Sequence, residues 1–211
     1  MNSLLLQNFT ETDFAPIDLS IDWISQQNLI LGTYESLEHY INKQLSVAKK
    51  PLGIGGFLEK RSIYQSSPHF NSSEKERNIH LGIDIWAPSD TPISMPFDGI
   101  IHSFAFNGEI QDYGATIITY HQALENCPYL LFGHLSRKDL EHIEVGIPVK
   151  KGMTIGHLGD RHDNGGWPPH LHIQVIVDIK DHFGDYPGVC SEVDLAYYKT
   201  QVLDPKPYIF K

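Results

Sequence analysis

Apolar positions recur at helical spacing near the start of the chain and alternate with polar positions later. Over residues 34–48, apolar and aromatic side chains return every three or four positions, which is typical of a helix that packs one face. Thr33 can cap the start of this helix, and Pro51 follows its end. Residues 1–50 are therefore predicted to be a helical N-terminal segment, followed by a domain over residues 51–211.

Short apolar or alternating runs, separated by turn signals such as Asp98-Gly99 and Asn107-Gly108, begin at residue 79. Many short strands with frequent turns are typical of an antiparallel barrel or sandwich. The pattern predicts a mainly β fold, with an antiparallel β-sheet sandwich or open barrel core and a helical N-terminal lead-in. The predicted strands cover residues 79–86, 92–95, 99–106, 115–120, 129–134, 153–158 and 170–179.

Two stretches carry no periodic signal. Gly53-Ile54-Gly55-Gly56 lacks the preceding strand and following helix of a dinucleotide-binding loop, so it is predicted to be a flexible turn. The tail from Asp181 is rich in aromatic residues and prolines, and it is predicted to wrap the core as loops with little regular structure.

Composition excludes several classes of partner. The formal net charge is −10 and no basic block is present, which argues against nucleic acid and anionic membranes. No apolar run approaches the about 18–20 residues of a spanning helix, and the N-terminus lacks the basic region of a signal peptide. These patterns predict a cytoplasmic protein and leave an extracytoplasmic one open. Cys127 and Cys190 lack metal-ligand spacing, and the sequence leaves their pairing open.

His170 and His172 lie two residues apart in an alternating run. Side chains two apart share one face of a strand, so these histidines and Gln174 lie on a polar face, opposite an apolar face that suits a core. The pattern places both imidazoles toward a cleft or solvent. Alone, such a pair is more often two exposed histidines at a strand edge.

His80 and Asp84 lie four residues apart, which in an ideal strand is about 13 Å. Both can reach one ion only if the chain bends, and Gly82 permits a bend. His134 ends another apolar run. Two imidazoles and a carboxylate make a catalytic zinc site with an open position, and spare histidines can act as acid and base near neutral pH.

Three fragments in this order resemble the motifs of the lysostaphin-type (LytM-like) zinc metallopeptidases, which include glycyl-glycine and peptidoglycan endopeptidases. The fragments are His80-Leu-Gly-Ile-Asp84, Gly133-His134-Leu135 and His170-Leu171-His172, and the similarity covers about residues 78–178. The resemblance implies Zn²⁺ as the cofactor, with His80, Asp84 and His172 as ligands. It implies His134 and His170 as the catalytic histidines, without dividing the roles between them.

The resemblance implies a zinc-dependent metalloendopeptidase that hydrolyses peptide bonds in peptidoglycan-derived or glycine-containing peptides, with a peptide or muropeptide as substrate. One alternative is a non-catalytic LytM-like binding or regulatory module. Another is a zinc amide hydrolase that acts on a small non-peptidoglycan substrate. The N-terminal segment is expected to block or shape the cleft.

Several residues depart from the family pattern or fall outside it. Trp167 precedes the histidine pair, where it either walls the cleft or packs a loop, and Gln174 replaces a glutamate that is frequent in the family. Arg77 either contacts a substrate carboxylate or forms the commoner surface ion pair. The remaining histidines are expected at the surface or in packing, and His162 is singled out among them because its loop leads into the site.

Overall fold

The computed structural model describes residues 1–64, 76–126 and 128–211. The strands of its main sheet are β1 (Phe14–Pro16), β2 (Leu52–Gly55), β4 (Ile83–Trp86), β6 (Gly99–Asn107), β7 (Gly114–Tyr120), β8 (Tyr129–Leu135), β9 (Pro148–Val149), β11 (His170–Ile176) and β13 (Val202–Leu203). Two small sheets contain β3 (Arg77–His80), β5 (Pro92–Ser94), β10 (Thr154–His157) and β12 (Val189–Ser191). The helices are α1 (Ile21–Gln26), α2 (Tyr34–Ala48), α3 (Leu195–Gln201) and α4 (Lys206–Ile209), with short 3-10 turns η1 (Glu11–Asp13) and η2 (Arg137–Leu140).

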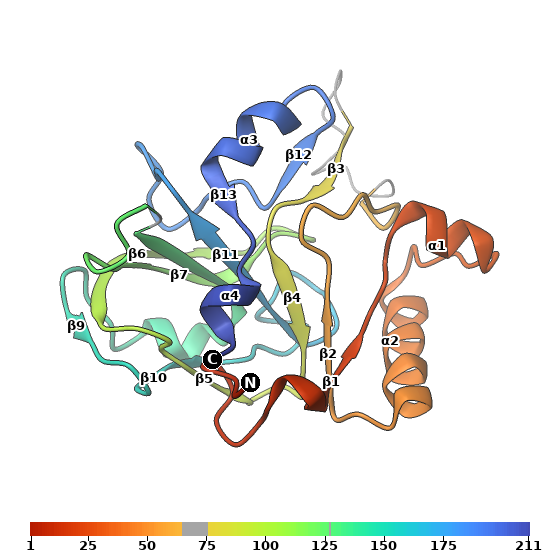
Figure 1. The fold of residues 1–211 in the computed structure, drawn as a ribbon, viewed down its shortest axis with the longest axis horizontal. Helices are drawn as coiled ribbons and strands as arrows, with labels where there is room; N and C mark the ends of the chain where they lie inside the picture. The colour runs from red at the N-terminus through yellow and green to blue at the C-terminus, as the bar shows by residue number, and fades with distance from the viewer. Residues whose placement is uncertain (65–75, 127) are drawn as a thin grey trace.

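The fold is mainly β and is built on one nine-stranded sheet (Figure 1). Its strand order is β1-β2-β4-β11-β8-β7-β6-β9, and β13 pairs with β11 beside this path. Its strand pairs are antiparallel except β1 with β2, which is parallel. Strands β1 and β9 end the path, so the sheet is open. This architecture confirms the predicted mainly β class, and each predicted run contains a strand.

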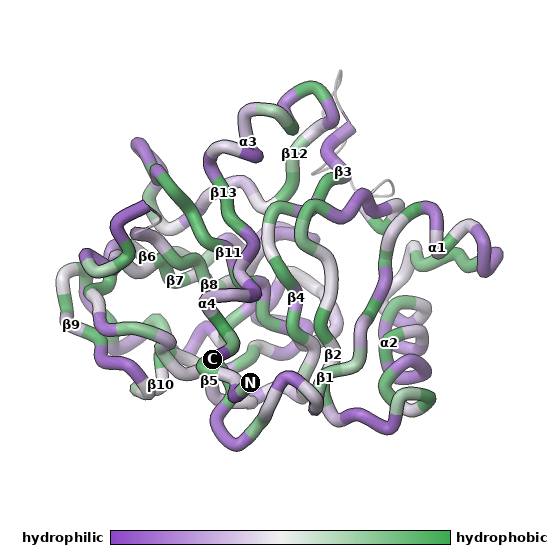
Figure 2. Tube along the Cα trace, viewed as in Figure 1, coloured by the Kyte–Doolittle hydropathy of each residue, from purple (hydrophilic) through white to green (hydrophobic). Residues whose placement is uncertain are grey.

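The two faces of β11 are both covered. Leu171, Ile173 and Val175 lie in the main apolar core, as the alternation predicted. His170 and His172 on the opposite face are also buried, so this face is enclosed and does not open directly to solvent. In Figure 2 the hydrophobic stretches follow the central strands, and hydrophilic ones gather in the peripheral loops.

The predicted N-terminal helix is present as α2. Thr33 caps it by accepting a hydrogen bond from the Ser36 amide, and Lys49 ends it in a left-handed conformation. The same segment also supplies β1, which the pattern did not indicate and which joins the main sheet through β2. Helices α1 and α2 lie beyond β1 at this edge of the molecule (Figure 1).

The prediction of a flexible turn at Gly53–Gly56 is wrong, because Leu52–Gly55 form β2 between β1 and β4. The glycines allow the chain at Ile17 to pack closely against β2. A Cβ atom on Gly55 would lie 2.2 Å from the carbonyl oxygen of Ile17. Composition alone does not reveal this use of glycine, because the approaching chain lies far away in sequence.

The prediction of an irregular tail is also wrong. Residues after Asp181 form β12, α3, β13 and α4, and β13 pairs with β11 at the centre of the sheet. The end of the tail pairs with the N-terminus, where the Asn2 amide donates to the Lys211 carbonyl at 2.7 Å. These elements have two to seven residues, too few for a readable period, and tertiary pairing forms them.

Within the described ranges, every helix is too short or too polar to cross a membrane. Cys190 is a buried free thiol, and Cys127 lies outside the described residues.

Candidate metal and catalytic site

A break between β3 and β4 brings His80 and Asp84 together. Their side chains approach to 3.2 Å between His80 Nε2 and Asp84 Oδ1. The break falls at Gly82, where a Cβ atom would lie 2.6 Å from the Ile173 carbonyl and 2.7 Å from the His172 ring. The predicted bend is therefore present, and close packing against β11 requires glycine at its corner.

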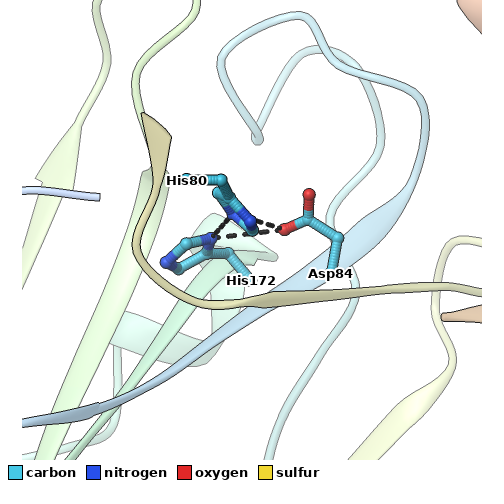
Figure 3. A group of neighbouring side chains, drawn as sticks. All are labelled: His80, Asp84 and His172. Atoms are coloured by element: carbon cyan, nitrogen blue, oxygen red, sulfur yellow. Dashed lines mark hydrogen bonds and ion pairs between the residues drawn. The ribbon is translucent and has the colours of Figure 1, made fainter. Parts of the chain in front are cut away.

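Strand β11 adds the third side chain of the cluster. It lies between β4 and β8, with His172 opposite Asp84 on one side and Gly133 on the other. His172 Nδ1 lies 2.8 Å from His80 Nε2 and 3.2 Å from Asp84 Oδ1 (Figure 3). The ligand-type atoms of these three buried residues all lie within 4.8 Å of one another.

The donor set fits a zinc ion. His80 Nδ1–H donates to the Gly56 carbonyl at 2.7 Å, which leaves the lone pair of Nε2 pointing into the cluster. His172 Nε2–H donates to Gln174 Oε1 at 3.1 Å, so a neutral His172 directs its Nδ1 lone pair to the same point. Two lone pairs and a carboxylate oxygen repel one another unless a cation lies between them. Zn–N bonds of about 2.0–2.1 Å in a tetrahedron separate ligand atoms by roughly 3.3 Å, close to the observed spacing.

His134 reaches the site through a bulge in β8. In a regular strand His134 would share the face of Phe132, which lies in the main core. The pairing of β8 with β7 shifts between Phe132 and Leu135, and His134 has a positive φ of 63°. Leu135 therefore takes the core position, and the imidazole of His134 turns to the face of the cluster.

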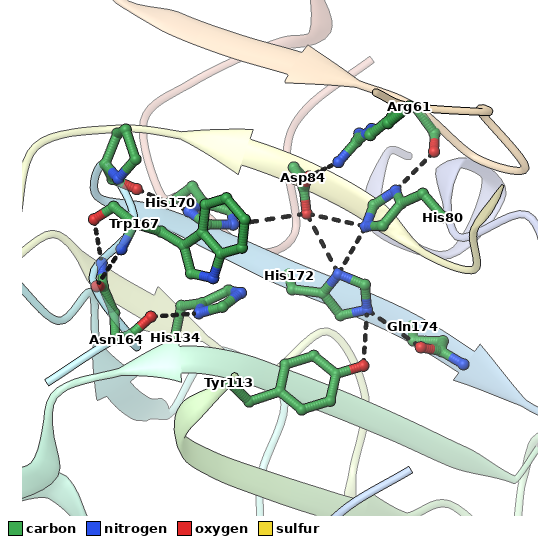
Figure 4. Close-up of polar contacts among 12 residues, drawn as sticks. Arg61, His80, Asp84, Tyr113, His134, Asn164, Trp167, His170, His172 and Gln174 are labelled. Atoms are coloured by element: carbon green, nitrogen blue, oxygen red, sulfur yellow. Dashed lines mark hydrogen bonds and ion pairs between the residues drawn. The ribbon is translucent and has the colours of Figure 1, made fainter. Parts of the chain in front are cut away.

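His134 and His170 form a pair beside the cluster, with ring centroids 4.2 Å apart (Figure 4). His170 Nδ1–H donates to the Pro168 carbonyl at 2.7 Å, and His134 Nδ1–H donates to the Asn164 carbonyl at 3.0 Å. Both rings therefore keep Nε2 for other partners. His170 Nε2 lies 3.8 Å from Asp84 Oδ1, and its ring stacks on Trp86.

Burial controls protonation in this site. It lowers the pKa of His80 to about 4 and the pKa of His134 well below its usual range. Burial also lowers the pKa of His170. Burial opposes ionisation of Asp84, but His80 and Arg61 beside it hold the pKa of its carboxyl well below the usual range. At neutral pH these imidazoles are therefore unprotonated at Nε2, as metal ligands and proton acceptors must be.

Side chains that sequence reasoning did not assign support the cluster. Gln174 holds His172 by the hydrogen bond described above, and the Tyr113 hydroxyl lies 3.4 Å from His172 Nε2. Arg61 is fully buried and bonds Asp84. Gln174 could have been found from its place on the histidine face of β11. Arg61 and Tyr113 carry no local signal, because they come from distant parts of the chain.

A cavity of about 240 Å³ opens beside the five residues. Leu19 and Leu37 from the N-terminal segment form part of its wall, so this segment shapes the cavity. Trp167 both lines the cavity and packs edge-on against Tyr64, with ring centroids 6.2 Å apart. Arg77 and His182 also line the cavity. His162, which the sequence had singled out, is exposed.

Two imidazoles and a carboxylate that face one point, with two more imidazoles beside them, are consistent with the metal site of a hydrolase. Residues 78–182 match the model of peptidase family M23. The chain therefore contains a peptidase M23 domain of the lysostaphin type. Members of this family are metallopeptidase hydrolases related to peptidoglycan.

The chain is similar to part of the DD-carboxypeptidase/endopeptidase Mpg of Neisseria meningitidis serogroup B, with 31% identity over 100 residues. These residues are 47% of this chain and 20% of that protein, so the similarity spans one fifth of the relative.

Solved structures of similar shape include LytU and the catalytic domain of EnpA from Enterococcus faecalis. LytU is 25% identical, with a TM-score of 0.46 over 74% of this chain and 82% of that chain. EnpA is 19% identical, with a TM-score of 0.45 over 74% of this chain and 90% of that chain.

Proposed function

We propose that this protein is a zinc-dependent metallopeptidase that hydrolyses peptide bonds in peptidoglycan-derived or glycine-containing peptides. The observation that carries the proposal is the convergence of His80 Nε2, His172 Nδ1 and Asp84 Oδ1 on one point beside a cavity. Family membership supports peptide hydrolysis as the reaction.

His80, Asp84 and His172 would hold the zinc ion. When bound, zinc supplies Lewis acidity that polarises a carbonyl and lowers the pKa of a water molecule to about 7. Since each residue already has a second hydrogen-bond partner, binding requires little reorganisation of the ligands.

His134 and His170 would handle the proton and the developing negative charge. In each ring a backbone carbonyl fixes Nδ1, and Nε2 does not take part in that bond. Each imidazole is neutral near pH 7. A neutral imidazole can accept a proton from the attacking water and return it to the leaving amine. Either imidazole, once it has taken this proton at Nε2, can stabilise the oxyanion by donation before it passes the proton to the leaving amine.

The cavity beside the cluster would hold the substrate. Trp167 and Pro168 lie on its wall next to His170, so the stretch in which the sequence departs from the family would contact a substrate bound there. Buried surroundings exclude water and strengthen the electrostatic contacts there.

The test compares His134→Ala with His80→Ala and His172→Ala. We expect His134→Ala to keep stoichiometric zinc and to lose about 10²–10⁴-fold in kcat/KM on glycine-containing peptides or muropeptides. Either ligand variant is expected to lose zinc and activity together. Metal content is measured by atomic emission and turnover by chromatography of the cleaved peptide.

His39→Ala is the matched control, because it changes an imidazole of α2 that neither lines the cavity nor joins the cluster. Full turnover by His134→Ala would contradict its catalytic role. A wild-type protein that binds zinc but cleaves neither peptides nor muropeptides would favour the non-catalytic binding module, and cleavage of small amides alone would favour the amide hydrolase.

A further inference from the structure

Arg61 precedes the residues that match the family model, yet its guanidinium lies against the metal cluster. Its side chain is 1% exposed. Nη1 donates to Asp84 Oδ2 at 2.6 Å (Figure 4). Nη1 also donates to the Tyr64 hydroxyl at 3.1 Å, and Nε donates to Glu59 Oε2 at 2.6 Å. A cation buried this deeply is uncommon unless its partners require it.

The two oxygens of Asp84 have different partners. Oδ1 faces His80 Nε2 and His172 Nδ1, each at 3.2 Å. Oδ2 turns away from this point and accepts the hydrogen bond from Arg61. Only one carboxylate oxygen is therefore presented to an ion in the cluster.

The loop that carries Arg61 also holds His80. The Gly56 carbonyl accepts from His80 Nδ1, and the Glu59 carbonyl accepts from the His80 amide at 2.9 Å. Gly56 has a φ of 76°, and a Cβ atom there would lie 2.2 Å from Arg61 Nη2. One turn of chain thus fixes the orientation of two of the three proposed ligands.

Burial of Arg61 leaves one donor unsatisfied. Within the described part of the chain, Nη2 has no hydrogen-bond partner. Native structures leave few buried donors unpaired, and those few often mark functional sites. Packing alone does not account for a guanidinium here, since an apolar side chain would fill the space without an unpaired donor.

We propose that Arg61 is a positioning residue that restricts Asp84 to one-oxygen binding and thereby favours four-coordinate zinc. This inference rests on the metal site of the proposed function. Zinc binds four ligands in a tetrahedron, whereas larger cations such as Ca²⁺ take both oxygens of a carboxylate and six to eight ligands. A guanidinium fits this task because it cannot lose its proton and its donors have a fixed geometry.

The first test measures zinc affinity by competition with a chromophoric chelator for Arg61→Met and Arg61→Lys. Loss of an outer-shell partner typically weakens metal affinity about 10–100-fold, and we expect that loss for Arg61→Met. Arg61→Lys is expected to restore part of the affinity, because it keeps the charge but not the fork of donors. Lys60→Met is the matched control, since Lys60 is exposed and pairs with Glu192 at the surface.

The second test replaces zinc by Co²⁺ and records the visible absorption. Four-coordinate Co²⁺ absorbs strongly, and added ligands weaken the band, so a carboxylate that binds through both oxygens gives a weaker band. We expect a strong band for the wild type and Lys60→Met and a weaker one for Arg61→Met.

A purely structural role predicts a lower melting temperature with unchanged zinc affinity and an unchanged cobalt spectrum, and that result would overturn the inference. If Arg61→Met does not fold, Arg61→Lys decides by the same two measurements, and wild-type values for both would overturn the inference. A wild-type protein without zinc affinity would instead overturn the proposed function together with this inference.

Discussion

At the scale of single residues, two backbone details assemble the site. The left-handed conformation of His134 turns its imidazole from the core to the cluster, and its backbone is held by the Tyr113 carbonyl and the Gly159 amide. Gly82 lets β3 turn into β4 under the ring of His172. The backbone conformation at both residues orients neighbouring side chains. A small substitution at Gly82 should therefore displace a proposed ligand without removing it.

We expect Gly82→Ala to weaken zinc binding about 10–100-fold, as for other changes that displace ligands without removing them. The added methyl group would press on the His172 ring and on the Ile173 carbonyl, neither of which can move without disturbing β11. Chelator competition measures the effect. Gly32→Ala is the control, because among the described residues no atom outside Gly32 and its two neighbours lies within 4 Å of the position that its added methyl group would take. Equal zinc affinity in both variants would count against the role of Gly82.

At the scale of elements, the N-terminal segment is part of the sheet and of the cavity wall. Strand β1 extends the sheet beside β2, and α2 packs through Leu37, Tyr40 and Ile41 into an apolar cluster that includes Trp86. Trp86 in turn stacks on His170. The segment therefore packs behind Trp86 and His170, in addition to forming part of the cavity wall.

Removal of residues 1–50 is expected to lower the free energy of unfolding by roughly 5–9 kcal/mol. Uncovering a large buried side chain costs about 1.5–3 kcal/mol, and the deletion would uncover Trp86, Ile63 and Val189. Urea unfolding measures the change. Val47→Ser, at an exposed position of α2, should leave the midpoint unchanged. A truncated protein with the wild-type midpoint and activity would show that the segment neither supports nor shapes the site.

At the scale of the whole molecule, the packing of the sheet and its loops buries several imidazoles in neutral form. His121 is fully buried, with Nδ1–H donating to the Asp98 carbonyl at 2.9 Å and Nε2 2.7 Å from the Thr119 hydroxyl. Burial lowers the pKa of both His121 and His134. The folded protein therefore binds fewer protons than the unfolded chain below the usual histidine pKa of 6.5.

The contribution of these neutral histidines to the free energy of unfolding of the metal-free protein is therefore expected to be fully present above about pH 6.5. It should fall as the pH drops below that value. Urea unfolding at pH 7.5 and 5.5 measures the difference. Acidification also reduces the net charge of −10, which acts in the opposite direction, so His121→Gln isolates the imidazole. The variant should show a smaller loss between the two pH values than the wild type. An equal or larger loss would contradict the assignment of a neutral buried His121.

Local sequence patterns were enough to predict many of the secondary-structure elements of this protein. Helix α2, the strands from β3 to β8, strands β10 and β11 and the apolar face of β11 follow from the spacing of apolar residues, because that spacing reflects the geometry of each element alone. Strand β9 was not predicted. The bend at Gly82 was also predictable, because two ligand-type side chains four apart in an extended run require one. The motifs named the five site residues, and the structure brings all five together.

Tertiary structure alone decided the rest, because the deciding contacts join residues distant in sequence. Alternation along β8 would have placed His134 in the core, and only its pairing with β7 creates the bulge that turns it outward. The strand at Gly53–Gly55 and the regular tail exist because other segments pair with them. Arg61 reaches Asp84 from 23 positions away in the chain, a separation over which spacing gives no signal. The sequence by itself thus predicted which side chains would bind a metal ion, and the tertiary structure decided how they are oriented and enclosed.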